Sequence, residues 1–441
     1  MIADATTLIL QHESRTIDDN TNLRARRRET RVRILYHHRT QGRGAEGNHI
    51  VSIVTALRSL GHEVDVLSPP GVDPFNAGSV KPDEASSGHE TSWSRFWRTV
   101  SLKMPKWLFE LAEMAYNLPA WFRLRSALRS KPYDIVYERY AAYLVAGSLA
   151  ARQADCEFLL EVNDVSGVDD RVRPQVFPRA CAWVERRLIA RCERVHAVSS
   201  YLGERLIETG LPSNRLVVAP NGFEVASIRL TASRQNMRRK FGLDDSLVLG
   251  FAGWFVGWDR LDFLVDVFKE LHQSYPQMRL CLVGDGEPLA EIKRTLHGTP
   301  LERLLVHTGP VPRGDVCNYI QMFDIGILPH SNLFGSPMIM FEMMALRMPI
   351  VAPKLPPIED VQRDEQTALL FAPLNSTDCL RQVSRLADSA KLRRSLAESA
   401  YQTLVQDHSW KRTAEKIISG LNGEASEYGK LPDAISCSRD R

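Results

Sequence analysis

The sequence has little of what would mark a disulfide scaffold, a zinc site or a membrane span. Its seven cysteines are scattered and include neither a Cys-x-x-Cys pair nor a Cys/His spacing typical of metal sites. This odd, unpatterned set suits buried thiols in a reducing compartment better than disulfide bonds. No apolar window reaches about 18 residues, and the first residues have no apolar core of the signal-peptide type. We therefore expect a cytoplasmic protein.

An excess of charge of one sign is also missing. The 56 Lys and Arg residues nearly balance the 53 Asp and Glu residues and leave a formal net charge of +3. Because so small a charge gives no broad positive field, we expect no nucleic-acid partner. The length of 441 residues is too great for one compact core and predicts two domains.

Short apolar runs that read as strands alternate with helical patterns along most of the chain. They are expected at 32–36, 64–67, 134–137, 158–162, 195–198 and 216–219, and then at 247–252, 280–283, 304–307, 325–328, 350–352 and 369–371. The clearest helix has apolar residues at i, i+3, i+4, i+7 and i+10 from Ile50 and ends at Gly61. Two consecutive series of strand–helix units predict an α/β protein with two doubly wound, Rossmann-like domains. Ligands bind such sheets at the carboxyl ends of the strands, so the site is expected in a cleft between the domains.

Segment 92–125 is unusually rich in basic and aromatic residues. Arg and Lys are interleaved there with four tryptophans, which are Trp93, Trp97, Trp107 and Trp121. A basic, aromatic, amphipathic segment is typical of peripheral contact with an anionic membrane, here on its inner face. The alternative is a helical hairpin that covers the first sheet and keeps the tryptophans in its core.

The most informative stretch runs from Asp324 to Ala345. It predicts a buried strand, a loop, and a helix that opens with Ser336 as N-cap and carries Glu342 in its second turn. Free backbone amides and the helix dipole would form an anion site there, made of Gly335, Ser336, Pro337 and Met338. A carboxylate at Glu342 would accept a hydrogen bond from a sugar hydroxyl beside bound phosphates. These are the needs of a nucleotide-sugar site.

This stretch resembles the donor-site motif of the family 4 glycosyltransferases, retaining enzymes of the GT-B fold and of the glycosyl transferases group 1 type. Many members read roughly G-S-P-x-K-x-F-E-x-M-A, and the matching positions are Gly335, Ser336, Pro337, Phe341, Glu342, Met344 and Ala345. The resemblance covers about 32–421. It implies transfer of a sugar from a UDP- or GDP-linked donor, without a metal cofactor, to a glycan or lipid-linked acceptor, as in surface or exopolysaccharide synthesis.

Two other segments resemble landmarks that set the domain boundaries in the family. The turn PNGFE at 220–224 resembles the end of the first domain, so the domains are expected at 31–224 and 225–408. The segment DHSW resembles the approach to a final helix, expected at 409–421, that returns to the first domain. Outside these domains, a polar, Arg-rich flexible arm is expected at 1–30 and a disordered tail at 422–441.

A glycine-rich loop between the first strand and the first helix is a second candidate site. Residues 42–47 read GRGAEG, a G-x-G-x-x-G match that alone is a weak signal for a dinucleotide. In the family, a Gly-rich loop with an acid and a following His faces the cleft. The resemblance therefore assigns Gly44, Glu46 and His49 to the sugar or acceptor side. NAD(P) binding and a tight turn without a ligand are the alternatives.

Polar residues also end two further strands of the first domain. The segments YERY at 137–140 and EVND at 161–164 resemble a subset of the family, whose other members carry His at the place of Asn163. Arg139 and Asn163 are therefore expected at the cleft. The alternative is a structural ion pair between Glu138 and Arg139.

In the second domain, the turn at 283–286 resembles a family turn that lets the nucleotide approach the backbone. Its candidate donor-binding residues are Gly284, Asp285 and Gly286. A DxD-like metal site made of Asp285 and Glu287 is the alternative, against which the tandem strand–helix pattern argues.

The chain also departs from the family pattern. The family usually has another acid at the position of Phe334, so only Glu342 remains. The basic pair that neutralises the diphosphate corresponds to Val256 and Asp259, and Arg260 is expected to substitute for it. The resemblance implies that Arg260 and the helix N-terminus stabilise the leaving diphosphate, while Glu342 holds the ribose. The missing groups leave a non-catalytic GT-B-like scaffold subunit of a glycan assembly as the alternative function.

Overall fold

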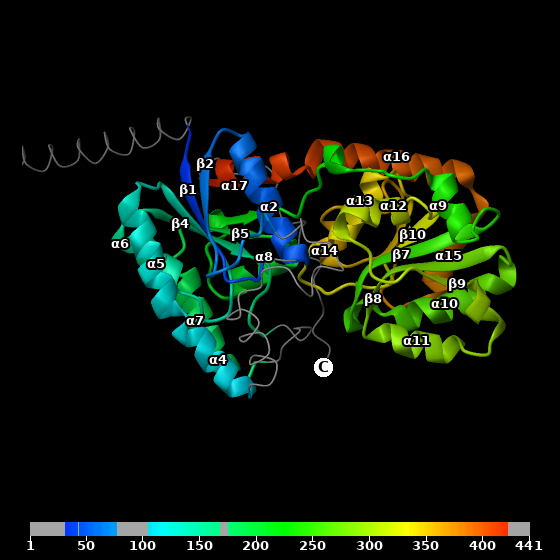
Figure 1. Ribbon diagram of the computed structural model, residues 1–441, viewed down its shortest axis with the longest axis horizontal. Coiled ribbons are helices and arrows are strands. Elements are labelled where there is room, and N and C mark those ends of the chain that lie inside the picture. Colours follow the sequence, from blue (N-terminus) through cyan, green and yellow to red (C-terminus); the bar gives the residue numbers. More distant parts are fainter. Residues whose placement is uncertain (1–30, 43, 77–104, 168–174, 422–441) are drawn as a thin grey trace, which may run out of the picture.

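Two parallel β-sheets, each with helices on both faces, form the molecule shown in Figure 1. The computed structural model describes residues 31–42, 44–76, 105–167 and 175–421. The flexible arm, the disordered tail, Trp93 and Trp97 of the sequence predictions lie outside these residues. The predicted fold class is confirmed.

The first sheet has six strands in the order β2-β1-β3-β4-β5-β6, all of them parallel. They are β1 (Arg33–His37), β2 (Glu63–Leu67), β3 (Ile135–Arg139), β4 (Glu157–Val162), β5 (Arg194–Ala197) and β6 (Leu216–Val218). The helices of this half are α2 (Gly44–Ser59), α4 (Lys106–Ala115), α5 (Asn117–Ser130), α6 (Ala146–Gln153), α7 (Pro178–Ile189) and α8 (Ser200–Glu208). Alternate residues of each strand point to opposite faces, so each face has its own apolar core.

The second sheet also has six parallel strands, in the order β12-β11-β10-β7-β8-β9. They are β7 (Leu247–Phe255), β8 (Met278–Gly286), β9 (Leu305–His307), β10 (Ile325–Ile327), β11 (Ile350–Pro353) and β12 (Leu369–Phe371). The helices of this half are α9 (Arg234–Lys240), α10 (Leu261–Ser274), α11 (Pro288–Leu296), α12 (Val316–Ile320), α13 (Met338–Ala345), α14 (Pro356–Glu359), α15 (Ser376–Asp388) and α16 (Ala390–Asp407). Two further apolar cores fill its faces.

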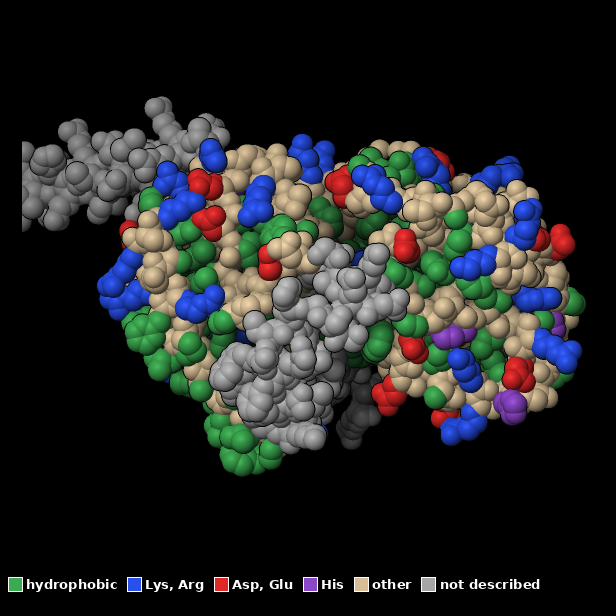
Figure 2. Space-filling view, in the orientation of Figure 1, with side chains coloured by type: hydrophobic (Ala, Val, Ile, Leu, Met, Phe, Trp, Pro, Cys, Tyr) green, Lys and Arg blue, Asp and Glu red, His purple; other side chains and the backbone are tan. Residues whose placement is uncertain are grey.

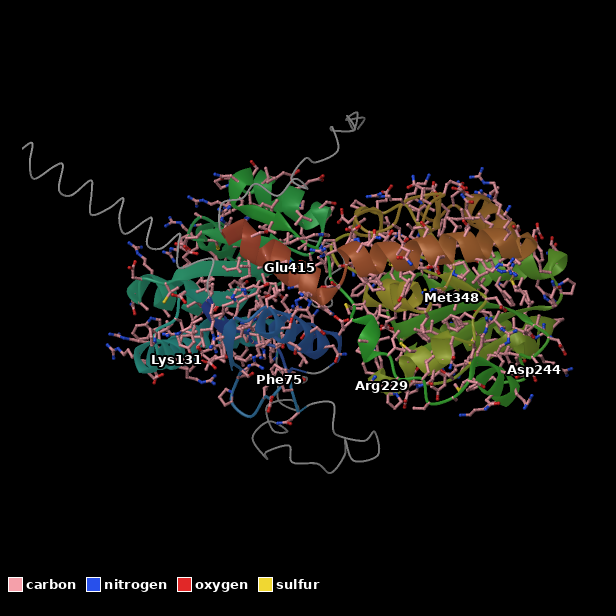
Figure 3. All side chains as sticks on the ribbon, turned by 90° about the horizontal axis from the view of Figure 1, so that it is seen from above. Phe75, Lys131, Arg229, Asp244, Met348 and Glu415 are labelled. Carbon is pink, nitrogen blue, oxygen red and sulfur yellow. The ribbon has the colours of Figure 1, made fainter. Side chains whose placement is uncertain are left out.

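The chain crosses between the two halves twice, and the crossings are tied together. The Phe223 N–H donates to the His408 carbonyl over 2.9 Å, and the Thr413 hydroxyl donates to the Pro220 carbonyl over 3.2 Å. After the second crossing, α17 (Trp410–Leu421) packs Trp410 into the core of the first half. Figure 3 accordingly shows Glu415, on α17, over the half that contains Lys131, with Met348 in the other half.

Two features qualify the sequence expectations. The hairpin alternative for 92–125 placed the tryptophans in the core, but Trp107 on α4 is 51% exposed. Trp121 on α5 is half-buried, with the Arg125 guanidinium over its ring. Within the described residues, no helix is long and apolar enough to cross a bilayer.

Candidate functional site

The helix α13 is apolar apart from one acid, Glu342, and a loop leads into it. α13 begins at Met338, and its N-cap position is Pro337, whose side chain makes no cap. The prediction of Ser336 as N-cap is therefore wrong by one residue. The Ser336 hydroxyl instead accepts the backbone N–H of Asn221 over 3.1 Å, which points it toward the first half.

Glu342 is buried in α13, with an exposed fraction of 2%. Its Oε1 pairs with the Arg313 guanidinium. Its Oε2 has no hydrogen-bond partner among the described residues. Burial raises the pKa of Glu342, and the charge of Arg313 offsets this only in part. A buried oxygen of this kind needs a donor, and a ligand hydroxyl can supply one.

Arg313 was not identified from the sequence. It opens a short 3-10 turn, Arg313–Asp315, after β9, and its side chain is 43% exposed. Since β9 and β10 are not neighbours in the sheet, strand patterns alone gave no reason to join this loop to Glu342. The only available signal was its place after the carboxyl end of a strand.

The glycine turn at the end of β8 lies at the same edge of the sheet. The Gly284 N–H donates to the Gly309 carbonyl over 3.1 Å, and the His307 ring contacts the Gly284 carbonyl at 2.8 Å. Gly284 has a φ of 127°, and a Cβ there would clash with the Gly253 carbonyl. The Asp285 carboxylate accepts the Gly286 N–H over 2.8 Å, within the turn itself. Glycine is thus required for the close approach of β7 and β8, whatever else it admits.

Arg260 lies at the start of α10, in a left-handed conformation with a φ of 49°. Its guanidinium is paired with Asp262, at 2.8 Å, and among the described residues it makes no ion pair with Glu342 or with the β8 turn. The neighbouring Asp259 accepts the Val256 N–H over 3.0 Å, and burial raises the pKa of Asp259 to about 7. The basic side chain paired with Glu342 in the structure is Arg313, whereas Arg260, expected at the diphosphate, is paired with Asp262.

In the first half, Glu161 is the centre of a buried polar network. Its Oε1 pairs with Arg139, lies 2.9 Å from His49 Nε2 and accepts the Asn163 amide over 2.7 Å. Its Oε2 accepts the Tyr36 hydroxyl over 3.1 Å. Burial alone would raise the pKa of Glu161, but the charges of His49 and Arg139 outweigh it and hold the pKa well below its ordinary value. His49, Arg139 and Asn163, which the sequence analysis singled out, thus share Glu161 as a partner. Glu161 itself was not singled out.

The Glu138–Arg139 ion pair considered from the sequence is wrong. Glu138 instead contacts the His37 ring at 2.6 Å and accepts the Gly147 N–H over 3.1 Å, with both side chains buried. Adjacent side chains of β3 point to opposite faces of the sheet, so Glu138 and Arg139 contact different sets of residues. Glu138 and Glu161 therefore belong to separate networks.

The glycine-rich loop joins β1 to α2. Gly44 has a φ of 62°, and a Cβ on Gly47 would clash with the Gly42 carbonyl, so the turn itself requires glycine. Gly44 and Glu46 are exposed in the first turn of α2, and the charge of Glu46 acts on Arg139. The loop therefore adjoins the Glu161 network.

Asn221 connects the two candidate sites. Its Oδ1 lies 2.9 Å from Nδ1 of His49, and its amide donates to the Ser336 carbonyl over 2.9 Å. Both ring nitrogens of His49 thus face acceptor oxygens, and Trp410 packs edge-on against the ring at 5.1 Å. The structure brings the first-half residues and the α13 loop together across Asn221, which the sequence reasoning treated only as part of a turn.

Comparisons with known proteins agree with this architecture. Residues 44–222 match the model of the glycosyl transferase 4-like domain, and residues 233–403 match the glycosyl transferases group 1 model. The fold is that of GT-B glycosyltransferases, and the chain belongs to the family 4 glycosyltransferases.

Individual relatives are distant. D-inositol 3-phosphate glycosyltransferase of Actinosynnema mirum is 28% identical over 71% of this chain and 76% of its own length. Alpha-D-kanosaminyltransferase of Streptomyces kanamyceticus is 22% identical over 49% of this chain, which spans only 57% of that relative. The solved structure of Anabaena HepE in complex with UDP has a TM-score of 0.65 at 17% identity, and covers 88% of this chain and 99% of its own.

Proposed function

We propose that the protein is a retaining glycosyltransferase that moves a sugar from a UDP- or GDP-linked donor to a glycan or lipid-linked acceptor in surface or exopolysaccharide synthesis. The observation that carries this proposal is the unsatisfied, buried Oε2 of Glu342 beside Arg313. Leaving such an oxygen unpaired costs about 1–3 kcal/mol. A ribose hydroxyl of a bound nucleotide would remove that cost, so the site is built for a ligand with a hydroxyl donor.

The leaving diphosphate needs positive charge as the bond from the anomeric carbon to the phosphate oxygen breaks. We assign this role to the N-terminus of α13 and the loop before it, which are Gly335, Ser336, Pro337 and Met338, and to Arg313. Arg260, paired with Asp262 in the structure, contributes only after a rearrangement. The leaving phosphate oxygen takes the acceptor's proton, so the mechanism needs no separate nucleophile. The turn of Gly284, Asp285 and Gly286 lines the donor side.

The Glu161 network forms the sugar and acceptor side in this proposal. Glu161 contacts His49, Arg139 and Asn163 at the same time. These contacts hold the three side chains in fixed positions. Preorganised polar groups of this kind stabilise a transition state at little reorganisation cost. Gly44 and Glu46, at the first turn of α2, would border the transferred sugar.

The first test is a thermal-shift screen with UDP, GDP, ADP and their sugar conjugates, with NAD as the comparison ligand. A nucleotide at about a hundred times its Kd should stabilise the fold by about 2.7 kcal/mol. A shift with one nucleotide class identifies the donor. If a folded sample shows no shift with any of them, the non-catalytic scaffold becomes the better reading, and a shift with NAD alone would return weight to the dinucleotide alternative.

Transfer activity then separates the roles of the charged residues. Glu342→Gln and Arg313→Gln should each lower kcat/KM by about 100-fold or more, the loss typical of a removed electrostatic contact to a transition state. Arg294→Gln is the matched control, because Arg294 is 74% exposed and, among the described residues, pairs only with Glu291 on α11. Full activity in Glu342→Gln would contradict the assigned site. Retention itself is read from the anomeric configuration of the product by NMR.

We also propose peripheral contact with an anionic membrane through α4 and α5. The exposed apolar side chains there are Trp107 at 51%, Leu111 at 44%, Leu118 at 62% and Phe122 at 59%. Figure 2 shows apolar side chains gathered at the end of the first half where α4 lies in Figure 1. An acceptor that carries a lipid would be met at such a face.

Flotation with liposomes that contain anionic lipid tests this contact. Trp107→Ala combined with Phe122→Ala should greatly reduce the bound fraction. Trp254→Ala removes an aromatic side chain that is 70% exposed in the second half, so it should leave flotation unchanged. Equal flotation of all three proteins would remove the membrane contact from the proposal.

A further inference from the structure

Trp254 is the most exposed large apolar side chain among the described residues, at 70%. It lies not in a loop but in β7, an interior strand of the second sheet, one residue before that strand ends at Phe255. A tryptophan on an interior strand usually buries its large ring against the next layer. The packing of the fold therefore does not account for the exposed indole of Trp254.

The alternation of side chains along β7 fixes the face of the sheet on which this indole lies. Val248 and Ala252 belong to the apolar core that α13 covers. Trp254 follows Ala252 by two residues, and side chains two apart in a strand lie on the same face. The indole is therefore on the α13 face of the sheet, and α13 is the helix that contains Glu342.

The position of Trp254 along its strand is that of the candidate donor site. Its register partner in β8 is Asp285, in the middle of the Gly284–Gly286 turn. On the other side, the register with β10 reaches only Gly250, four residues earlier. At the level of Trp254, the chain after β10 is therefore already in the loop that leads to α13. Face and level together place the indole between the β8 turn and that loop.

The carboxylate of Asp285 lies next to the indole. Cys281 and Val283 of β8 belong to the core under α13, and Asp285 continues their alternation, so it shares the face of Trp254. Neighbouring strands are about 4.8 Å apart, which makes register partners on one face immediate neighbours. An aromatic surface beside a carboxylate suits a ring that stacks and also carries an N–H or O–H donor.

The backbone holds the indole in a fixed place. β7 and β8 stay in register one residue further, through Phe255 and Gly286. A tryptophan side chain has two rotatable bonds, so fixing it against a ligand costs little conformational entropy. No Lys or Arg occurs from Trp254 to Asp259, and Arg260 is paired with Asp262. This part of the site is therefore suited to a ring rather than to a phosphate.

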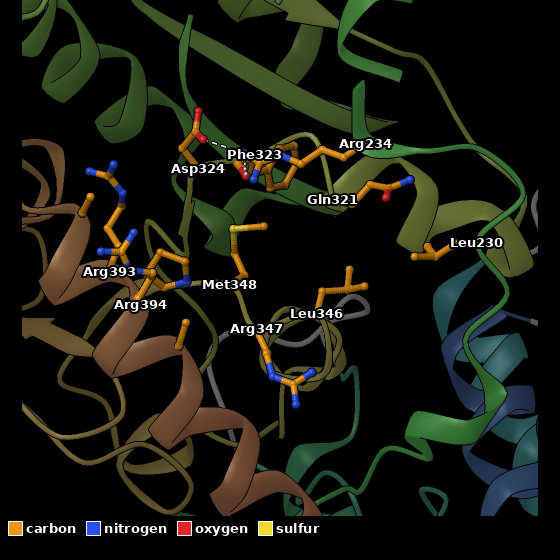
Figure 4. A pocket seen from close by; sticks show the side chains of 13 residues that line it. Leu230, Arg234, Gln321, Phe323, Asp324, Leu346, Arg347, Met348, Arg393 and Arg394 are labelled. Atoms are coloured by element: carbon orange, nitrogen blue, oxygen red, sulfur yellow. Dashed lines mark hydrogen bonds and ion pairs between the residues drawn. The ribbon is translucent and has the colours of Figure 1, made fainter. Parts of the chain in front are cut away.

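The opposite edge of the same sheet has no such surface. A cavity of about 430 Å³ opens there (Figure 4), lined in part by Asp324 before β10 and Met348 before β11. The aromatic ring in its lining, Phe323, is fully buried, and Asp324 is paired with Arg234. The cavity therefore offers no exposed ring, whereas the carboxyl edge, where ligands of parallel α/β sheets bind, does.

We propose that Trp254 is the stacking platform for a ring of the donor, which is either the nucleobase or the transferred sugar. The proposal rests on the proposed function, because it takes the donor to lie between the β8 turn and α13. A nucleobase stacks with its π-face on an indole, and a sugar stacks with its apolar C–H face. Trp254 is thus a residue that selects the donor by contact and takes no part in breaking the bond.

Calorimetric titration of the full chain with UDP, UDP-glucose, GDP and GDP-mannose tests the proposal. Trp254→Ala should weaken the tightest of these ligands by about tenfold, whereas Trp254→Phe keeps a ring and should retain most of the affinity. Trp183→Ala should bind as the wild type does. It is the matched control, because Trp183 is 54% exposed on α7, in the first half. Equal melting temperatures without ligand check that the variants are folded.

The ligand series identifies the ring. Equal loss for UDP and UDP-glucose places the nucleobase on Trp254, whereas loss confined to UDP-glucose places the sugar there, and the GDP pair is interpreted in the same way. If Trp254→Ala binds every ligand as the wild type does while Glu342→Gln loses binding, the donor site is supported and the stacking role is overturned. If the wild type binds none of the four ligands, the proposed function and the stacking role are both contradicted.

Discussion

At the scale of single residues, buried acids define both candidate sites, and each acid depends on a basic partner from another element. Glu342 on α13 is paired with Arg313 after β9, and Glu161 on β4 is paired with Arg139 on β3. The two respond oppositely: the pKa of Glu342 is raised and that of Glu161 is lowered. Glu161 is saturated with donors, while Glu342 keeps one oxygen without a partner.

Glu161→Gln should therefore destabilise the fold, and the effect should depend on pH. Removing one partner of a buried ion pair costs about 3–5 kcal/mol. Because the folded pKa of Glu161 lies below its unfolded value, the charged form stabilises the fold above about pH 4.3, and this is lost as pH falls through the folded pKa. Urea unfolding at pH 7, 5 and 4 measures the free energy of unfolding of both proteins. The difference between wild type and variant should be smaller at pH 4 than at pH 7.

Glu291→Gln is the control for this experiment, because Glu291 is exposed and its one ion pair within the described part of the chain is with Arg294. Its effect should stay within about 0.5 kcal/mol at every pH. The proposed role of the Glu161 network would be contradicted if the free energies of unfolding of wild type and Glu161→Gln differ little at pH 7, or differ more at low pH.

At the scale of elements, the turn between β8 and α11 is set by steric necessity. Gly284→Ala should destabilise the fold by more than about 1 kcal/mol, because the Cβ would clash with the Gly253 carbonyl and φ is 127°. Gly257→Ala, near the end of β7, meets nothing within 4 Å and should be nearly neutral. Thermal unfolding compares the two, and equal melting temperatures would show that β7 and β8 can move apart at their ends.

The same scale shows how far sequence reasoning reaches. The expected strand at 350–352 is Ile350–Pro353 in the structure, since apolar runs record burial on both faces of a parallel sheet. Partners across elements are a different matter. The hydroxyl of Ser336 goes to Asn221, and Arg313 goes to Glu342, because loops distant in sequence meet at a sheet edge. Local capping preferences and strand order do not predict these long-range contacts.

At the scale of the whole molecule, one small side chain spans the two halves. Asn221 contacts His49 of α2, and both the backbone carbonyl and the hydroxyl of Ser336 before α13. Closure of two such domains around a donor excludes water and assembles the site. The side chain of Asn221 therefore lies where the relative position of the halves is fixed.

Asn221→Ala should loosen this connection without unfolding either half. Hydrogen exchange is expected to rise in the loop before α13 and in the first turns of α2, while the central strands keep their protection. Asn318→Ala is the matched comparison, since Asn318 is also buried and accepts the Thr231 N–H over 2.8 Å, but lies wholly in the second half. Unchanged exchange at both Asn221 contacts would show that other contacts hold the halves.

The contacts of Asn221 have a consequence for the order in which substrates bind. This one side chain touches His49 on the proposed acceptor side and the loop before α13 on the proposed donor side. Linkage is reciprocal: the factor by which bound nucleotide changes the affinity for an acceptor must equal the factor by which a bound acceptor changes the affinity for the nucleotide. Titrating either ligand in the presence of the other therefore determines one number twice.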